Sequence, residues 1–390
     1  VKNAPTRHLG TMLADNHTME NEYLRVAVQP NGTLKLTDKR NNQIYPDLLT
    51  FEDRSDIGDG WFHVSAVNDQ AFSSTACSAN VAVVADGIAK ATLKVVLNME
   101  LPRDFRFDKM VRNEEIAPLR ITNFITLRAG SDYLEVKTIV ENTIRDHRLR
   151  VLLPSGTQAQ TYFADSAYDI IERSITLDTN RGDHIEMETE TKPQYTWTAV
   201  HDPDQTSRGL AVISTGLPES AVRDLPDRPI ALTLLRSFFN TVLTSGEEGG
   251  EIQGTHVFNY AIMPLGDELP RTRLCRLGQQ LAAPARSIQL EPRDLGGTAT
   301  SLPSTHSFIK TPPHQAVITA IQQRSDSKGL VIRMFNPYEN VINETLEFGQ
   351  KVRSAERTDL EGKTLESLPV SGNQIEVAMK AKQIATLRTT

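Results

Sequence analysis

The chain has 390 residues, a formal net charge of −7 and 39% hydrophobic residues. This length provides material for two or three domains with sizeable cores. The acidic balance argues against a nucleic-acid-binding protein, which needs a basic face to displace counterions. No apolar run approaches the roughly 20 residues that cross a bilayer, so we expect no membrane span, and the polar residues after Val1 predict no signal peptide. Two distant cysteines, Cys77 and Cys275, favour reduced thiols in a cytoplasmic protein over a disulfide or a thiolate metal site.

Residues 1–20 are polar and aperiodic, which predicts a linker or an extended arm. From residue 21 onward, polar and apolar side chains alternate with the period of a half-buried strand. The pair Asn31-Gly32 separates two such alternating runs and is a strong hairpin signal. A β-domain is therefore expected to begin at residue 21.

The stretch Phe51–Phe62 places four acidic residues and two glycines before an aromatic pair. One interpretation is an acidic surface turn, because Gly and Asp are common in turns. The other is a loop that presents carboxylates and the Trp61 ring to a sugar, whose C–H face stacks on aromatic rings while its hydroxyl groups need acceptors. Both interpretations place the whole stretch in a loop.

Long strands bounded by turn residues are predicted for most of the sequence that follows. They are rich in Val, Ile, Thr and Leu and cover residues 79–86, 89–101, 119–127, 133–141, 148–153, 195–200, 209–214, 230–235 and 256–263. These strands are too many and too long for an immunoglobulin-sized sandwich. A large antiparallel double sheet or barrel is therefore predicted for residues 21–285.

One helix is expected at Arg271–Ala283, where leucines recur at spacings of three and four before Pro284. Residues 286–314 are rich in Pro and Gly and predict a loop-rich connection to a second domain at 315–390. Six short strands are expected in this second domain, at residues 316–322, 330–335, 343–348, 354–359, 374–379 and 383–388. Their regular spacing is typical of a small antiparallel sandwich, so the predicted fold class of the whole chain is all-β.

Local motifs for chemistry are few. No two of the nine histidines are three or four residues apart, so no zinc motif is visible, and neither a phosphate-binding loop nor a nucleophile elbow occurs. Among 49 acidic residues, sequence spacing singles out no pair of carboxylates for glycoside hydrolysis. Arg236 and Arg333 end or lie within expected strands and are candidates for buried arginines that bridge two sheets. No catalytic or metal-binding residue is assigned.

Two further features have both a structural and a functional interpretation. The run Asp146–Arg148 could orient a general base, but its position just before a strand favours an ion pair at the strand end. Trp197 lies within a strand pattern and is expected in the core. Trp61 follows a glycine in the acidic stretch and is expected on a ligand-facing surface.

Six groups of residues, spread along the chain in order, carry a resemblance. They are Asn31–Lys39 (NGTLKLTDK), Glu52–Asp59 (EDRSDIGD), Asp146–Val151 (DHRLRV), Gly209–Val212 with Gly216–Glu219 (GLAV and GLPE), Leu232–Ser237 (LTLLRS) and Arg333–Pro337 (RMFNP). Together they resemble the C-terminal half of glycoside hydrolase family 38, the α-mannosidases, and most of all bacterial members of the mannosylglycerate hydrolase type.

This resemblance implies a galactose-mutarotase-like supersandwich followed by a small β-sandwich. Members of the family carry an N-terminal α/β catalytic domain with an Asp nucleophile and a zinc ion, followed by a helical bundle. The His-x-Asp motif that begins those sites does not occur in this sequence. The chain therefore resembles the C-terminal part of a retaining enzyme, with no cofactor of its own, zinc in the missing catalytic domain and no activity alone.

The resemblance also implies a role for the acidic stretch. In the family, a loop of the supersandwich closes one side of the sugar pocket, and Gly58–Trp61 looks like that loop, with Trp61 near the position of a family tyrosine. Asp56, Asp59 and Trp61 are thus expected to rim a site for an α-mannoside or a mannosylglycerate-like sugar. The expected partner is the N-terminal catalytic domain of the same protein, with a homo-oligomer as a further possibility and with neither nucleic acid nor membrane as a partner.

Two alternatives belong to other classes of protein. A free-standing sugar epimerase on the same fold would need a histidine, either His147 or His256, beside a carboxylate on a concave sheet. A non-catalytic carbohydrate-binding module would need only the Trp61 surface.

Overall fold

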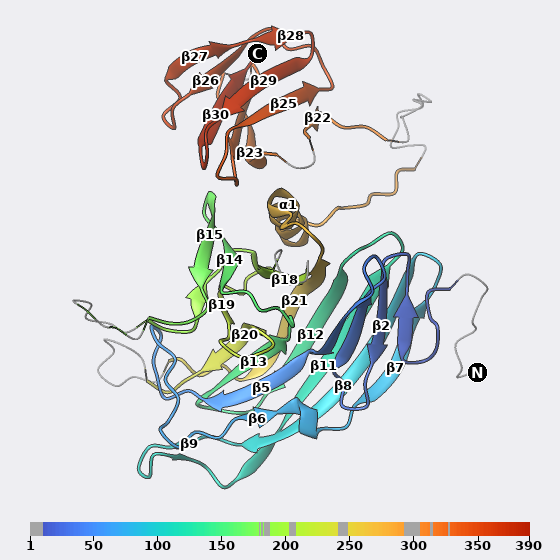
Figure 1. Ribbon diagram of the computed structural model, residues 1–390, viewed down its shortest axis with the longest axis vertical. Helices are drawn as coiled ribbons and strands as arrows, with labels where there is room; N and C mark the ends of the chain where they lie inside the picture. The colour runs from blue at the N-terminus through green and yellow to red at the C-terminus, as the bar shows by residue number, and fades with distance from the viewer. Residues whose placement is uncertain are drawn as a thin grey trace. The chain divides into compact units, whose positions relative to one another are not determined.

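The computed structural model describes residues 11–178, 180, 182, 188–202, 208–240, 249–291, 305–312, 315–326 and 328–390. These residues belong to two compact units (Figure 1), one formed by residues up to 164 with 172–269 and the other by 165–171 with 270–390. Within the described ranges there is one α-helix, and no helix is long and apolar enough to cross a membrane. The fold is all-β, as predicted. Much of the connection expected at 286–314 lies outside the described residues.

The first unit contains three antiparallel sheets and a two-stranded ribbon, except that residues 165–171 of β14, β15 and their connecting turn belong to the second unit. The nine-stranded sheet has the order β15-β14-β17-β18-β21-β12-β11-β8-β7 and consists of β7 (Asn80–Asp86), β8 (Lys90–Pro102), β11 (Ile116–Arg128), β12 (Leu134–Asn142), β14 (Thr161–Ser166), β15 (Asp169–Ser174), β17 (Trp197–Asp202), β18 (Arg208–Ser214) and β21 (Gly254–Leu265). The six-stranded sheet has the order β16-β19-β20-β13-β5-β6 and consists of β5 (Thr50–Ser55), β6 (Phe72–Ser73), β13 (His147–Leu153), β16 (Lys192–Pro193), β19 (Glu219–Val222) and β20 (Ile230–Ser237). The four-stranded sheet follows chain order through β1 (Thr18–Glu20), β2 (Leu24–Val28), β3 (Leu34–Asp38) and β4 (Gln43–Leu48), and the ribbon pairs β9 (Phe105–Arg106) with β10 (Val111–Arg112). A single 3-10 turn, η1 (Ser74–Ala76), follows β6.

Alternating side chains explain how these sheets share a core. In β12, every second side chain from Leu134 to Asn142 is buried, which is the period of a strand with one face on a core. The long strands β8 and β11 pair over 13 residues without a register shift, from Lys90 opposite Arg128 to Pro102 opposite Ile116, and run side by side in Figure 1. Apolar side chains from all three sheets form one continuous cluster, so the predicted large antiparallel supersandwich is confirmed.

The six-stranded sheet has two chemically different faces. Phe51 of β5 and Leu149 of β13 point into the apolar core, and we call this side the inner face. Glu52 and Arg150, one residue further along each strand, point to the opposite side, which we call the outer face, because successive side chains alternate. Arg150 lies directly opposite Glu52 in the strand register. Charged residues therefore line the outer face in a pattern that the strand period sets.

The second unit is the small sandwich. Its helix α1 (Arg271–Ala282) matches the predicted helix to within one residue. Its two sheets have the orders β22-β25-β29-β28 and β23-β24-β30-β26-β27 and consist of β22 (Ile309–Lys310), β23 (Val317–Gln323), β24 (Leu330–Phe335), β25 (Ile342–Phe348), β26 (Ala355–Thr358), β27 (Thr364–Leu368), β28 (Val370–Ser371), β29 (Gln374–Met379) and β30 (Ile384–Thr389). Ile332, Leu346 and Ile375 lie in a separate apolar core between them, so the predicted small β-sandwich is confirmed.

Strand β5 corrects the expectation that the whole acidic stretch is a loop. Thr50–Ser55 is hydrogen-bonded between β13 and β6, and the Glu52 and Asp53 side chains are buried. Buried carboxylates need partners, and these partners are arginine and histidine side chains from distant strands. Only the residues after Ser55 form the loop. A smaller difference is β1, which begins at Thr18 inside the stretch expected to be an arm.

Candidate functional site

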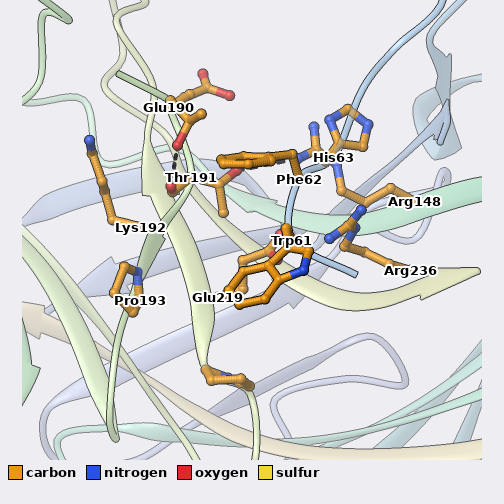
Figure 2. A pocket seen from close by; sticks show the side chains of 12 residues that line it. Trp61, Phe62, His63, Arg148, Glu190, Thr191, Lys192, Pro193, Glu219 and Arg236 are labelled. Atoms are coloured by element: carbon orange, nitrogen blue, oxygen red, sulfur yellow. Dashed lines mark hydrogen bonds between the residues drawn. The ribbon is translucent and has the colours of Figure 1, made fainter. Parts of the chain in front are cut away.

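A pocket of 460 Å³ opens on the outer face of the six-stranded sheet, a volume in the range of about 300–1,000 Å³ that is typical of ligand pockets. Figure 2 shows its side chains, which come from five parts of the chain. The loop after β5 contributes Trp61, Phe62 and His63, strands β13, β19 and β20 contribute Arg148, Glu219 and Arg236, and the segment around β16 completes the wall. The pocket thus combines two aromatic rings with charged groups of both signs.

Hydrogen bonds within the loop after β5 fix its shape. The Asp56 Oδ1 atom accepts the backbone N–H groups of Gly58 at 3.1 Å and Val64 at 3.4 Å, and the Asp59 N–H donates to the Phe62 carbonyl at 3.0 Å. A Cβ atom on Gly58 would lie 1.9 Å from that carbonyl oxygen. Only glycine allows this close approach, which explains the residue at this position.

Arg236 of β20 ties the loop to the sheet. Its Nε donates to Asp56 Oδ2 at 2.7 Å, and its Nη2 donates to Asp56 Oδ1 at 3.3 Å and to the Asp59 carbonyl at 2.7 Å. Such a forked arrangement is geometrically specific. Burial raises the pKa of Asp56, and the hydrogen bond from Arg236 opposes this shift. Arg236 was expected to bridge two sheets, but the contacts that the structure shows join strand β20 to the loop after β5 instead.

The three residues expected to rim a sugar site differ in what they face. Trp61 is 74% exposed and lines the pocket. The Asp59 Oδ1 atom accepts the backbone N–H groups of Trp61 at 2.8 Å and Phe62 at 3.0 Å, so it positions the aromatic pair. The Asp56 side chain is fully buried and is engaged by Arg236 and the loop backbone. Two carboxylates thus shape the loop, and one ring faces the cavity.

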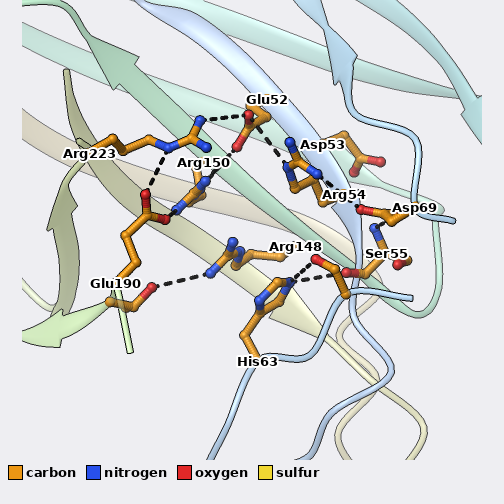
Figure 3. Close-up of polar contacts among 12 residues, drawn as sticks. Glu52, Asp53, Arg54, Ser55, His63, Asp69, Arg148, Arg150, Glu190 and Arg223 are labelled. Atoms are coloured by element: carbon orange, nitrogen blue, oxygen red, sulfur yellow. Dashed lines mark hydrogen bonds and ion pairs between the residues drawn. The ribbon is translucent and has the colours of Figure 1, made fainter. Parts of the chain in front are cut away.

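A closed ring of four charged side chains underlies the pocket (Figure 3). Arg150 donates to Glu52 Oε1 at 2.7 Å and to Glu190 Oε2 at 3.0 Å. Arg223 donates to the remaining oxygens, Glu52 Oε2 at 3.1 Å and Glu190 Oε1 at 2.9 Å. Although burial opposes it, the two arginines lower the pKa of both Glu52 and Glu190. The ring is fully paired, which is the condition under which buried charges are tolerated.

His63 at the pocket is neutral. Burial and then the nearby Arg148 guanidinium lower the pKa of His63 to about 2, with a further contribution from Arg236. A neutral imidazole can donate one proton, and Nε2 lies 3.1 Å from the Ser55 carbonyl oxygen. Burial is the main cause of this low pKa, and the positive charge of the nearby arginines adds to it.

A second charged cluster lies on the inner face. His147 Nδ1 lies 2.5 Å from Asp53 Oδ2, with both side chains fully buried, and Arg112 Nη1 forms an ion pair with Asp53 Oδ1 at 2.6 Å. The expectation of a surface ion pair at the end of a strand is therefore wrong for His147, whose partner comes from β5. Burial and then the Glu251 carboxylate raise the pKa of the neighbouring Asp146 to about 7.

Metal-binding groups are absent from the part of the chain that the structure describes, where no three His, Cys, Asp or Glu side chains gather around a common point. Cys77 is half-buried and Cys275 is buried, and the two are not joined in a disulfide bond. Trp197 is fully buried, as predicted. The arrangement at the pocket suits the binding of a polar ligand through a ring and fixed charges.

Sequence reasoning missed two pocket residues, Glu190 and Glu219. Glu190 precedes the two-residue strand β16 and has no periodic pattern around it. Glu219 accepts a hydrogen bond from Thr233 Oγ1 at 2.8 Å. Its only sequence signal was its place at the end of the resembling segment Gly216–Glu219.

Comparison with known protein families gives two adjoining matches. The sequence model described as the glycosyl hydrolases family 38 C-terminal domain matches residues 19–240. The model described as the glycosyl hydrolases family 38 C-terminal beta sandwich domain matches residues 315–387. The first match includes the whole outer face of the six-stranded sheet, and the second includes most of the small sandwich.

Three known proteins that resemble this chain are much longer than it is. A protein of Halalkalibacterium halodurans described as a "Putative mannosylglycerate hydrolase" is 27% identical, over 95% of this chain and 41% of that protein. The crystal structure of an alpha-mannosidase from Enterococcus faecalis V583 matches with a TM-score of 0.82 and 25% identity, over 98% of this chain and 43% of that one. A glycosyl hydrolase family 38 protein from Enterococcus faecalis shares the fold with a TM-score of 0.79 at 24% identity, over 99% and 45% of the two chains. The chain thus spans less than half the length of these relatives.

Proposed function

Because the chain belongs to glycosyl hydrolase family 38 and corresponds to its C-terminal region, we propose that it supports the catalytic domain of a larger α-mannosidase-type hydrolase and rims its sugar pocket. The parent enzyme would cleave α-mannosides or mannosylglycerate-like sugars with retention of configuration. The 390 residues alone would be inactive. The nucleophile and the zinc ion would be supplied by the part of the enzyme outside this chain, because the described residues offer no side-chain group that fits a metal.

The observation that carries this proposal is the exposed Trp61 ring on a rigid loop. A large aromatic side chain with 74% exposure would gain by burial against a partner or ligand. Its backbone N–H is fixed by Asp59, so little backbone conformational entropy is lost when a ligand binds. Aromatic faces stack on the C–H face of sugars, and the adjacent pocket offers charged hydrogen-bonding groups.

The proposal is tested by comparing the hydrolytic activity of two proteins. Turnover of 4-nitrophenyl α-mannoside is measured, with zinc present, for the 390-residue chain and for the longer enzyme that contains it. We expect turnover only from the longer enzyme. Zinc-dependent turnover by the shorter chain at a comparable rate would show that the catalytic groups lie within it and would overturn the proposal.

The two alternative functions receive different support. A sugar epimerase would need a histidine and a carboxylate that a sugar can reach, but the His147–Asp53 pair is fully buried on the inner face. The exposed Trp61 would also suit a carbohydrate-binding module. Binding of methyl α-mannoside by the chain, together with no effect of Trp61 on turnover by the longer enzyme, would favour that alternative.

A further inference from the structure

Three arginines form a row across the outer face of the six-stranded sheet. Arg148 of β13 lies directly opposite Arg54 of β5 on one side and Arg236 of β20 on the other. Directly opposite residues on neighbouring strands point to the same face, and like charges in such positions destabilise a sheet. A row of three guanidinium groups therefore needs negative charge to balance it.

The two outer members of the row have carboxylate partners. Arg54 lies 3.5 Å from Asp69 and 3.6 Å from Glu52. Arg236 forms its forked contact with Asp56 at 2.7 Å. The protein itself thus supplies negative charge to both ends of the row.

The central arginine has no such partner among the residues that the structure describes. Its one side-chain hydrogen bond goes from Nη1 to the Thr191 hydroxyl at 3.3 Å, and its Nε has no hydrogen-bond partner. Arg148 is only 5% exposed, and it lines the pocket beside Arg236 (Figure 2). Burial and then the nearby Arg150 lower the pKa of Arg148 to about 9, so the group is still charged at neutral pH. The Glu219, Asp56 and Glu190 carboxylates favour the charged form of Arg148 from a distance, but none of them forms an ion-pair contact with it among the described residues. A buried cation beside a cavity that lacks a contacting anion is stabilised when one binds.

We propose that Arg148 forms an anion subsite in this pocket and binds the carboxylate or phosphate of an acidic sugar. A guanidinium offers a planar fork of N–H donors that matches either group. Of the two carboxylates at the pocket, Glu190 is already shared by Arg150 and Arg223, whereas Glu219 bonds Thr233 Oγ1 and is available to accept from sugar hydroxyl groups. The inference rests on the proposed function only in taking the ligand to be a sugar.

The test is a titration of the 390-residue chain with D-glycerate, inorganic phosphate and neutral methyl α-D-mannoside. Binding is followed by tryptophan fluorescence, because Trp61 borders the pocket while Trp197 is fully buried, and is confirmed by calorimetry. We expect an anion to bind and Arg148→Gln to weaken that binding about 10- to 100-fold, in line with the loss of a charge-assisted hydrogen bond. The glycerate and phosphate arms identify which oxyanion the site prefers.

Two further variants serve as controls. Arg148→Lys retains the charge but loses the fork and should restore part of the affinity. Arg120→Gln removes the same charge from β11, where the Arg120 side chain is 50% exposed and pairs with a Glu141 side chain that is 53% exposed. This variant should leave anion binding unchanged. The anion should raise the melting temperature of the wild type and leave that of Arg148→Gln unmoved, and Arg148→Gln without ligand should melt at or above the wild-type temperature.

Equal anion affinity in the wild type and in Arg148→Gln would overturn the inference, as would binding of methyl α-mannoside without any binding of the two anions. Neither result depends on catalysis. Anion binding that requires Arg148, combined with turnover by the longer enzyme that is indifferent to Trp61, would instead leave the inference standing and remove the proposed role at the sugar pocket.

Discussion

The two faces of the six-stranded sheet bury charge in different ways. On the inner face, the Asp53 carboxylate is shared by His147 and Arg112, and all three side chains are nearly or fully buried. On the outer face, a closed ring that includes Glu52 is fully paired, but Arg148 beside it is left without a carboxylate partner among the described residues. Buried charge is thus common to both faces. What distinguishes the outer face is an incomplete pairing that lies next to a cavity.

The largest expected effect comes from breaking the inner cluster. Asp53→Ala leaves the buried Arg112 guanidinium and His147 ring without their carboxylate. We expect the free energy of unfolding, measured by urea denaturation, to fall by about 3–5 kcal/mol. Asp108→Ala is the matched control, because its ion pair with Arg106 joins two side chains that are 42% and 63% exposed, and it should lose less than about 1 kcal/mol. Similar small losses in both variants would contradict a structural role for the inner cluster.

The closed ring on the outer face should also be structural, with a smaller effect. Arg150→Gln removes one of two arginines that hold Glu52 and Glu190, while Arg223 still contacts both. We expect a loss of about 2–4 kcal/mol in the free energy of unfolding. Arg148→Gln, two residues away on the same face, should lose nothing in the same urea experiment. If both variants lost stability equally, the distinction between the paired and the unpaired arginine would be wrong.

A third prediction concerns Asp146, which lies directly before β13 and belongs to neither cluster. Its pKa is raised from 3.8 to about 7. Between these two pH values, the folded state keeps a proton on Asp146 that the unfolded state has lost. The free energy of unfolding should therefore be highest near the lower end of this pH range and should fall as the pH rises towards about 7. The expected fall is roughly 1–2 kcal/mol after allowance for relaxation around the site.

The variant Asp146→Asn isolates this contribution. Asp146 accepts the backbone N–H groups of Phe105 at 3.2 Å and Phe239 at 3.1 Å, so the variant has a lower stability that does not depend on this titration. The measured quantity is the difference in unfolding free energy between wild type and variant at pH 5 and at pH 8. An unchanged difference at the two pH values would show that the Asp146 pKa is ordinary.

Much of the fold could be predicted from the sequence, because strand alternation and turn residues are local signals. Strand β24 and strand β29 have the predicted bounds, and the Asn31-Gly32 hairpin joins β2 and β3 as expected. Strand β5 could not be predicted. Its acidic residues contradict strand propensity, and the arginines that compensate them lie 98 and 171 residues away in the chain.

The candidate site was only partly predictable. The exposure of Trp61 followed from the glycines and acids around it, and Arg236 was singled out as an arginine at the end of a strand. The significance of Arg148 could not be predicted from the sequence, because it depends on which carboxylates contact the arginines on the neighbouring strands. Sequence alternation places Arg148 and Arg150 on one face, but only the three-dimensional pairing separates the partnered arginine from the unpartnered one.

The most direct test of the central claim is the kinetics of Trp61→Ala in the longer enzyme, with Trp61→Phe as the control that retains a ring. Because the side chain is 74% exposed, the unfolding free energy should change by less than about 0.5 kcal/mol. Loss of stacking should lower kcat/KM for an α-mannoside about 2- to 10-fold, and Trp61→Phe should recover most of it. Unchanged KM and kcat in a folded Trp61→Ala enzyme would show that this loop is a surface turn and not part of the sugar site.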